Sequence, residues 1–210
     1  MPSLRKPADV SLLPLFLAAA AYLIGSISFA VVVSRLYGLP DPRTFGSRNP
    51  GATNMLRGGN RMAALWTLVG DTLKGVVAVA LARALLPADA APEAWLALCA
   101  LAVFLGHLFP LFFGFTGGKG VATAAGILVT LYWPLGLGTL LAWLAVFALT
   151  RVSSMAALSA AAAAPVLAWG WLGAGPLSAA VTVMSALLIW RHRSNIRKLL
   201  SGEEAAFRRR

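Results

Sequence analysis

Long apolar runs dominate the chain and are separated by short polar or charged connections. A helix needs about 20 predominantly apolar residues to cross a bilayer. Seven runs follow this pattern, although the fourth is short for a full span. The pattern predicts an all-α integral membrane protein, a single membrane domain over residues 1–210 built as a bundle of seven transmembrane helices. The approximate spans are 12–34, 62–86, 94–115, 121–133, 134–150, 155–172 and 175–190, followed by a basic tail at 191–210.

The first run, 12–34, follows Arg5 and Lys6 and so shares features with a signal peptide. It is longer than the roughly 7–15 apolar residues of a signal-peptide hydrophobic region. We therefore expect a retained span rather than a cleaved leader.

Cations alternate between present and absent in successive connections. They occur after the first, third and fifth runs and in the tail, which places fourteen of the 18 lysines and arginines on one face. Because cytoplasmic connections carry an excess of Lys and Arg, the pattern predicts the N-terminus outside and the C-terminus in the cytoplasm. Arg5 and Lys6 argue for the opposite orientation, but the five arginines of the first connection outweigh them.

The composition excludes several classes of protein. Hydrophobic residues make up 59% of the chain and charged residues 12%, against roughly 45–50% and 25% in soluble domains. These values argue against a soluble enzyme, an extracellular domain and a disordered chain. The net charge of +11 would suggest nucleic acid in a soluble protein. Since no aromatic platforms accompany the basic residues, we expect no nucleic acid, and membrane lipids explain the tail cations.

The polar stretch 45–57 has a turn at its centre, formed by Pro50 and Gly51. Such a turn leaves backbone N–H groups and short polar side chains available to an anion. Arg48 and Arg57 add charged donors suited to phosphate oxygens. By itself the stretch fits equally well an ordinary polar loop whose arginines set the topology.

A second stretch places Lys119 among Gly117, Gly118 and Gly120, where backbone can approach a ligand closely. It is not a Walker A loop, which requires Ser or Thr after the lysine, so nucleotide hydrolysis has no support. A flexible hinge with one topological lysine is the alternative interpretation. His107, just before it, is either functional or a hydrogen-bonded structural residue.

Two smaller polar groups open the sixth run and close the seventh. Arg151, Ser153 and Ser154 at a helix N-terminus suit an anion, although one serine could instead cap the helix. His192 and Asn195 are three residues apart and share a face on a continuing helix.

The sequence offers few residues for acid–base catalysis by paired carboxylates or for metal binding. No two acids pair in a motif loop, so two-carboxylate catalysis has no support. The single cysteine, Cys99, fits a small buried hydrophobe, and we expect neither a metal site nor a cofactor. Asp71 and Lys74, three apart in the second run, are either a self-neutralising pair or a functional one, such as the relay of a transporter.

Taken together and in order, these stretches resemble the bacterial acyl-phosphate:glycerol-3-phosphate acyltransferases, the PlsY family. The resemblance covers roughly residues 20–204. Arg48 stands where the family commonly has Gly, and Thr116 where it commonly has Lys. The matching elements are Gly25-Ser26-Ile27, Gly46-Ser47-x-Asn49-x-Gly51-Ala52-Thr53-Asn54-x-x-Arg57, Asp71-x-x-Lys74-Gly75, Gly106-His107-x-x-Pro110, Gly117-Gly118-Lys119-Gly120-Val121-Ala122-Thr123, Arg151-x-Ser153-Ser154, His192-x-x-Asn195-Ile196 and Leu199-Leu200-Ser201-Gly202-Glu203.

The resemblance implies transfer of a fatty acyl group from acyl phosphate to the 1-hydroxyl of glycerol 3-phosphate, giving lysophosphatidic acid and phosphate, in phospholipid biosynthesis. It implies a multi-pass protein of the bacterial cytoplasmic (inner) membrane with its active site facing the cytoplasm. The expected catalytic residues are His107, Lys119, Ser153 and Asn195. The residues expected to bind substrate or phosphate are Ser47, Asn49, Gly51, Thr53, Asn54, Arg57, Gly117, Gly118, Lys119, Arg151, Ser153, Ser154, His192 and Asn195.

The residues fit this chemistry independently. Acyl phosphate is an activated mixed anhydride, so positioning and charge stabilisation suffice without an enzyme nucleophile. The fifth residue after His107 is Phe112, so the His-x4-Asp pattern of enzymes that use acyl-CoA is absent. A transporter using Asp71 and Lys74, or a non-catalytic lipid-binding protein, are the competing hypotheses.

Overall fold

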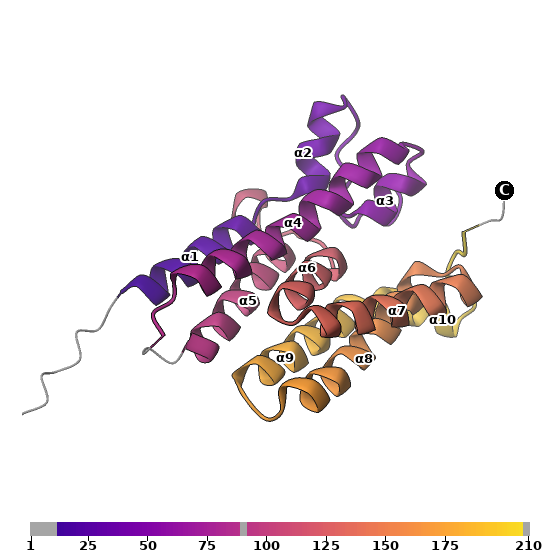
Figure 1. The fold of residues 1–210 in the computed structure, drawn as a ribbon. Helices are drawn as coiled ribbons and strands as arrows, with labels where there is room; N and C mark the ends of the chain where they lie inside the picture. Colours follow the sequence, from indigo (N-terminus) through magenta and orange to yellow (C-terminus); the bar gives the residue numbers. More distant parts are fainter. Residues whose placement is uncertain (1–11, 89–91, 208–210) are drawn as a thin grey trace, which may run out of the picture.

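The computed structural model describes residues 12–88 and 92–207, and regular structure in these ranges is entirely helical (Figure 1). The predicted all-α fold is therefore confirmed for this part of the chain. Arg5, Lys6, Asp89 and the terminal arginines 208–210 lie outside the described residues. The helices are α1 (Leu13–Gly25), α2 (Phe29–Leu36), α3 (Ala52–Arg57), α4 (Arg61–Leu85), α5 (Pro92–Leu108), the 3-10 helix η1 (Leu111–Phe113), α6 (Val121–Leu131), α7 (Trp133–Thr150), α8 (Ser153–Leu172), α9 (Pro176–Arg191) and α10 (Arg193–Leu200).

The first apolar run, 12–34, is not one continuous helix. It divides into α1 and α2, which are bent by 45° relative to each other. Ser28 is extended at the break, with φ −86° and ψ 94°, and the backbone carbonyl of Ile27 is left without a helical donor. The ammonium of Lys74 on α4 donates to that carbonyl at 2.8 Å. A side chain from another helix thus satisfies the polar backbone that the break exposes.

Helix length separates the elements into two groups. Among the described residues, α4, the α5–η1 segment, α7 and α8 are long and apolar enough to cross a membrane, and the bent α1–α2 pair would make a fifth span. The apolar helices α6 and α9 have only 11 and 16 residues. Length alone therefore supports four or five spans of a multi-pass protein, fewer than the seven apolar runs predict.

Glycines allow two pairs of helices to cross closely. Where α5 crosses α1, a Cβ added at Gly106 would lie 2.3 Å from the carbonyl oxygen of Tyr22. Where α6 crosses α4, a Cβ at Gly126 would lie 2.1 Å from the carbonyl oxygen of Thr72. Small residues permit such backbone contact between helices in membranes, and further contacts of α4 with α1 and α5 join the two pairs.

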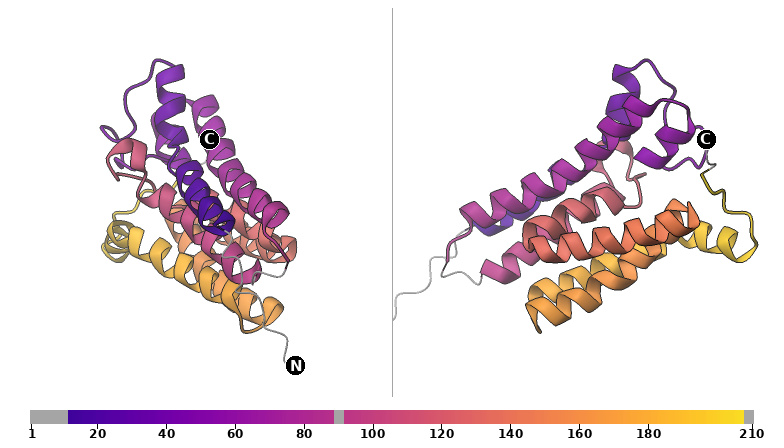
Figure 2. Two further views of the ribbon diagram at one scale, coloured as in Figure 1. Left: turned by 90° about the vertical axis from the view of Figure 1, so that its left-hand side faces the viewer. Right: turned by 45° about the vertical axis from the view of Figure 1, so that its right-hand side comes forward.

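The remaining helices form the other side of the bundle. Helix α7 packs on α8, and α9 packs on both α8 and α5, so α5 and α6 lie between the two sides (Figure 2). The core at this junction contains Phe104, Ile127, Leu135 and Met184, all buried. Helices α2 and α3 pack on α4 and form a second, smaller core around Met55. Figure 1 shows α2, α3 and α10 near the same end of the bundle.

Candidate active site

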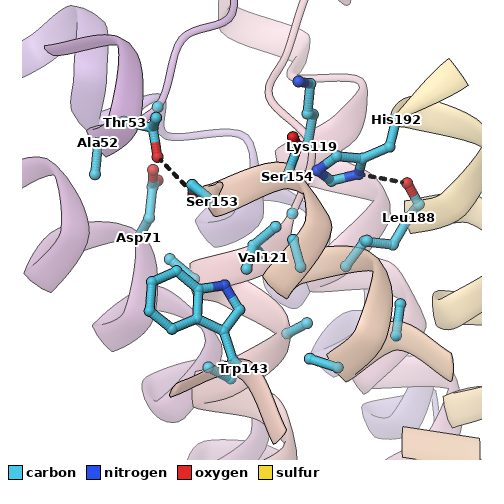
Figure 3. A pocket seen from close by; sticks show the side chains of 18 of the residues that line it. Ala52, Thr53, Asp71, Lys119, Val121, Trp143, Ser153, Ser154, Leu188 and His192 are labelled. Carbon is cyan, nitrogen blue, oxygen red and sulfur yellow. Dashed lines mark hydrogen bonds between the residues drawn. The ribbon is translucent and has the colours of Figure 1, made fainter. Parts of the chain in front are cut away.

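A cavity of about 570 Å³ lies between α4, α6, α7, α8 and α9. Its volume is within the range of about 300–1,000 Å³ typical of small-molecule sites. One end is polar and is formed by connections that are far apart in the sequence (Figure 3). The polar and charged residues that line this end are Ser47, Asn49, Thr53, Asn54, Arg57, Asp71, His107, Lys119, Ser153, Ser154, His192, Asn195 and Glu204.

The loop before α3 is organised around the side chain of Asn54. Its Oδ1 accepts from the backbone N–H of Ser47 at 2.9 Å and from the Ser47 hydroxyl at 3.2 Å. Its Nδ2 donates to the carbonyls of Pro42 at 2.8 Å and Phe45 at 3.2 Å. Because both amide hydrogens are used, Asn54 holds the loop in place. Ser47, Asn49, Gly51 and Thr53, which are predicted to bind substrate or phosphate, also line the cavity.

Backbone geometry explains why the family commonly has glycine where this chain has Arg48. Arg48 has φ +56°, in the left-handed region, which costs a non-glycine residue roughly 1–2 kcal/mol. Glycine adopts this conformation freely, so the family's glycine fits the turn. The other departure, Thr116, is exposed and bonds to the carbonyl of Gly114 at 3.2 Å. Neither side chain lines the cavity.

The Gly-rich segment before α6 is held from two sides. The N–H of Gly118 donates to the carbonyl of His107 at 3.2 Å. Arg191 donates to the carbonyls of Gly117 at 2.6 Å and Gly118 at 3.1 Å. The two glycines therefore do not line the cavity themselves but fix the backbone that presents Lys119. This clamp argues against the flexible-hinge interpretation.

Lys119 reaches into the polar end and donates to Oδ1 of Asn195 on α10. Burial is the main influence that lowers the pKa of the ammonium to about 8, and the nearby carboxylate of Glu204 opposes it. The group is thus a cation at neutral pH that is partly stripped of water, as suits a phosphate site.

The serines at the start of α8 do not cap the helix, because the N-cap position is Val152 and has no side-chain cap. Both hydroxyls turn into the cavity instead. Ser153 is 3.2 Å from the hydroxyl of Thr53, and Ser154 donates to Glu204 at 2.8 Å. The capping alternative is therefore wrong, and the two polar stretches predicted separately meet here.

Glu204 is a site residue that the sequence analysis missed. Its side chain is 5% exposed, and its Oε1 accepts from Ser154 and, at 2.9 Å, from the Asn195 amide. The guanidinium of Arg57 is 3.9 Å from the same oxygen. The carboxylate thus accepts hydrogen bonds from Ser154 and Asn195, two residues that we expect to bind a substrate anion. The signal available in the sequence was the pair of acids in an otherwise basic tail.

The end of the chain stays beside Glu204 through further contacts. Arg57 donates to the carbonyl of Ala205 at 3.2 Å and lies over the ring of Phe207. The N–H of Phe207 donates to the carbonyl of Arg151 at 2.9 Å. Arg151 is exposed, with φ +59°, and does not line the cavity. Its contribution in the structure is a backbone contact rather than a charge facing the cavity.

His192 lies between α9 and α10, and its Nδ1 is 2.8 Å from the carbonyl of Leu188 (Figure 3). A carbonyl only accepts, so Nδ1 carries the proton and Nε2 is an acceptor. Burial lowers the pKa of the imidazole to about 4. The ring is therefore neutral at pH 7, suited to accepting a hydrogen bond from a hydroxyl at Nε2 rather than to attracting phosphate by charge.

His107 belongs to a buried cluster with Asp71, Lys74 and Thr123. The hydroxyl of Thr123 donates to the Asp71 carbonyl at 2.9 Å, and its oxygen is 3.0 Å from Nδ1 of His107. Since that hydroxyl hydrogen is used, Nδ1 of His107 is the donor to Thr123. Nδ1 of His107 is also 3.6 Å from Oδ1 of Asp71. These contacts hold α5 against α4 and α6 below the Lys119 segment.

Beyond the polar end the cavity is apolar. Alanines of α8 face larger side chains of α7 and α9, among them Trp143 and Met184. The alanines leave room between the helices, and the space suits an alkyl chain. Over residues 12–88 and 92–207, no three His, Cys, Asp or Glu side chains gather in a way that could hold a metal ion.

Comparison with known proteins gives a consistent result. A family model described as "Glycerol-3-phosphate acyltransferase" matches residues 15–202. A protein of that name from Burkholderia thailandensis is 58% identical over 193 residues, covering 91% of this chain and 94% of that protein. Another of that name, from Thiobacillus denitrificans, is 55% identical over 196 residues, covering 93% of this chain and 98% of that protein.

Solved structures agree with these relatives. The chain is similar to PlsY, described as an integral membrane glycerol 3-phosphate acyltransferase, in its glycerol 3-phosphate form, with a TM-score of 0.87 and 37% identity. The similarity covers 93% of this chain and 96% of that one. The lysophosphatidic acid form gives a TM-score of 0.85. These similarities overturn the alternative of a transporter built on Asp71 and Lys74.

Proposed function

The chain belongs to the glycerol-3-phosphate acyltransferase family, and we propose that it transfers a fatty acyl group from acyl phosphate to the 1-hydroxyl of glycerol 3-phosphate. The products are lysophosphatidic acid and inorganic phosphate, which places the reaction in phospholipid biosynthesis. The observation that carries the proposal is the cavity itself. It joins an end rich in phosphate-binding groups to an apolar space that suits an acyl chain.

The reaction needs no covalent enzyme intermediate. The hydroxyl oxygen attacks the acyl carbonyl carbon and forms the ester bond, while the bond from that carbon to the phosphate oxygen breaks. The hydroxyl proton passes to a substrate phosphate, and inorganic phosphate leaves. Acyl phosphate is already activated, so the enzyme contributes proximity and stabilisation of the developing negative charge.

The cationic side chains take the phosphates in this proposal. Arg57 and Lys119 supply charged donors, and Asn195 and Ser154 supply neutral ones once Glu204 gives way. Ser153 and Thr53, paired across the cavity, complete the polar wall. Ser47, Asn49 and the backbone at Gly51 lie in the loop that faces them.

The two histidines take different roles. His192 is neutral and presents its Nε2 near Lys119 as an acceptor for a hydrogen bond from a substrate hydroxyl. His107 donates from Nδ1 to Thr123 on α6, and its backbone carbonyl accepts from Gly118 in the segment before α6. Acting as a positioning residue, His107 supports Lys119 rather than the reacting atoms.

We propose seven spans, with α6 and α9 as short spans shielded by their neighbours. The N-terminus lies outside and the active site faces the cytoplasm across the bacterial inner membrane. Residues from all four cation-bearing connections or segments, such as Arg57, Lys119, Ser153 and Asn195, meet at the polar end of the cavity. By the positive-inside rule, that end is cytoplasmic.

One assay tests the activity. Purified protein receives palmitoyl phosphate and glycerol 3-phosphate, and both released phosphate and lysophosphatidic acid are measured. We expect turnover in the wild type and a loss of more than roughly 100-fold in the Arg57→Ala, Lys119→Ala double variant, since charged contacts to phosphate are lost. Turnover no higher than in that variant would contradict the proposal, and turnover with palmitoyl-CoA alone would contradict the donor.

A further inference from the structure

Asp71 on α4 is the acid in the cavity wall that the proposed phosphate chemistry does not use. Its side chain is buried, with 4% exposure, yet Asp71 is one of the residues that line the cavity. Figure 3 shows its carboxylate pointing toward Thr53, at the level of the contact between Thr53 and Ser153. The acid therefore faces the space where the glycerol moiety would lie.

The charge partner of the carboxylate contacts only one of its two oxygens. Lys74 is 2.7 Å from Oδ1 and neutralises its charge, and the ammonium also donates to the carbonyl of Ile27. His107 is 3.6 Å from the same oxygen, and its Nδ1 is engaged by Thr123. Oδ1 is thus enclosed beside Lys74 and His107, whereas no described residue donates a hydrogen bond to Oδ2, the oxygen left for a ligand.

A polar atom at a cavity wall that has no protein donor is open to a hydrogen bond from a ligand. A hydroxyl of a ligand could donate to Oδ2 on binding. Of the two proposed substrates, glycerol 3-phosphate alone carries alcohol hydroxyls. A negative side chain is an unfavourable neighbour for a phosphate, so Asp71 also favours the orientation in which the phosphate lies toward Arg57 and Lys119.

We propose that Asp71 accepts a hydrogen bond from the 2-hydroxyl of glycerol 3-phosphate and thereby selects and orients this substrate. The inference rests on the proposed function and concerns the same cavity. The 1-hydroxyl must present its oxygen to the acyl carbon and release its proton to a substrate phosphate. The 2-hydroxyl lies between the reacting carbon and the phosphate and is free to donate to a fixed acceptor.

The wild-type protein offers the first test. The analogue 3-hydroxypropyl phosphate keeps the phosphate and the attacking hydroxyl but lacks the 2-hydroxyl. A site built to bind a hydroxyl discriminates strongly against an analogue that lacks it. We expect kcat/KM to fall roughly 10- to 100-fold with the analogue, and its binding in the absence of acyl phosphate to weaken similarly. Equal binding of the two compounds would overturn the proposal.

A variant pair then assigns the effect to Asp71. Asp71→Asn alone leaves the Lys74 ammonium buried without its counter-charge, so the test uses Asp71→Asn with Lys74→Gln, in which the Gln amide can still donate to the Ile27 carbonyl. We expect this neutral pair to fold, to lose affinity for glycerol 3-phosphate roughly 10-fold or more, and to bind both compounds about equally. Retained discrimination in the pair would overturn the proposal.

The matched control is Thr67→Val, on the same helix one turn before Asp71, buried and outside the cavity wall. It should leave discrimination between the two compounds unchanged. Binding measured by calorimetry without acyl phosphate separates the two proposals. An inactive wild type that still prefers glycerol 3-phosphate contradicts the acyl transfer alone, whereas an active wild type without that preference contradicts the role of Asp71 alone.

Discussion

At the scale of single residues, the charge of Lys119 depends on two opposing influences, burial and a nearby carboxylate. Burial lowers the pKa of its ammonium and the carboxylate of Glu204 raises it, and the balance puts the pKa at about 8. The cation is therefore present below pH 8 and is lost as the pH rises through that value. Any phosphate contact made by Lys119 in the free enzyme should share this dependence.

The corresponding prediction concerns product inhibition. In the wild type we expect inhibition by inorganic phosphate to weaken as the pH rises above 8, because Lys119 loses its proton. In Lys119→Arg the guanidinium stays charged, so the weakening should move to higher pH. Inhibition constants measured across the pH series check this, and identical profiles for the two proteins would contradict it.

Glu204 places a negative charge where a phosphate is expected to bind. Its carboxylate accepts from Ser154 and Asn195 and lies 3.9 Å from Arg57. In Glu204→Gln the amide oxygen can still accept from these groups, but the competing charge is gone. We expect inorganic phosphate to inhibit the variant roughly 3- to 10-fold more strongly at pH 7, as removal of one nearby like charge implies.

Glu203 provides the control for this variant, because it precedes Glu204 in the same segment and its side chain is exposed. Glu203→Gln should leave phosphate inhibition unchanged. Weaker inhibition in Glu204→Gln would mean that the carboxylate organises the donors rather than competing with the ligand.

At the scale of elements, close helix crossings decide how the bundle holds the cavity. The crossing of α1 and α5 leaves no space for a Cβ at Gly106, which would meet the carbonyl oxygen of Tyr22 at 2.3 Å and the backbone of Gly25 at 2.9 Å. His107 follows directly, so any shift of α5 there also moves the contact between His107 and Thr123.

We therefore predict that Gly106→Ala lowers the free energy of unfolding by about 1–3 kcal/mol, the usual cost of overpacking. Thermal unfolding in detergent measures it. Gly170→Ala on α8 is the matched control, because a Cβ at Gly170 meets nothing within 4 Å. Equal melting temperatures for the two variants would show that the backbones at the crossing can separate without loss.

At the scale of the whole molecule, the distribution of charge and the position of the cavity agree. The polar end draws its residues from the connections after the first, third and fifth apolar runs and from the C-terminal segment. The alternating cations predict these connections to be cytoplasmic. An acyltransferase in this orientation would meet water-soluble glycerol 3-phosphate at the cytoplasmic surface and its lipid chain within the bilayer.

Single-cysteine labelling tests this orientation. The native Cys99 is fully buried, so the wild type should react little with a membrane-impermeant maleimide. Ala206→Cys in the C-terminal segment and Ala174→Cys between α8 and α9 are both exposed positions. In intact spheroplasts we expect labelling of residue 174 alone, and of residue 206 only after lysis. The reverse pattern would contradict the proposed orientation.

The sequence by itself determined the all-helical class, the family and the polar stretches that carry the chemistry. Apolar runs and turn-forming residues are local signals, since a helix or a Gly-Pro turn depends on neighbours in the chain. Ser47, Arg57, Lys119 and Asn195 were accordingly predicted as site residues, and the structure places all four on the cavity wall.

Only the tertiary structure decided which of these residues face the cavity and which support it. The side-chain amide of Asn54 holds the loop, and Arg151 contributes its backbone carbonyl. Glu204 lies at the polar end, although the sequence indicated only that the cations of its tail set the membrane topology. At the bend between α1 and α2, the ammonium of Lys74 donates a hydrogen bond to the free backbone carbonyl of Ile27. These outcomes depend on contacts between segments far apart in the chain. Hydrogen-bonding capacity and close backbone approach decide which residues pair there, and the local sequence pattern does not.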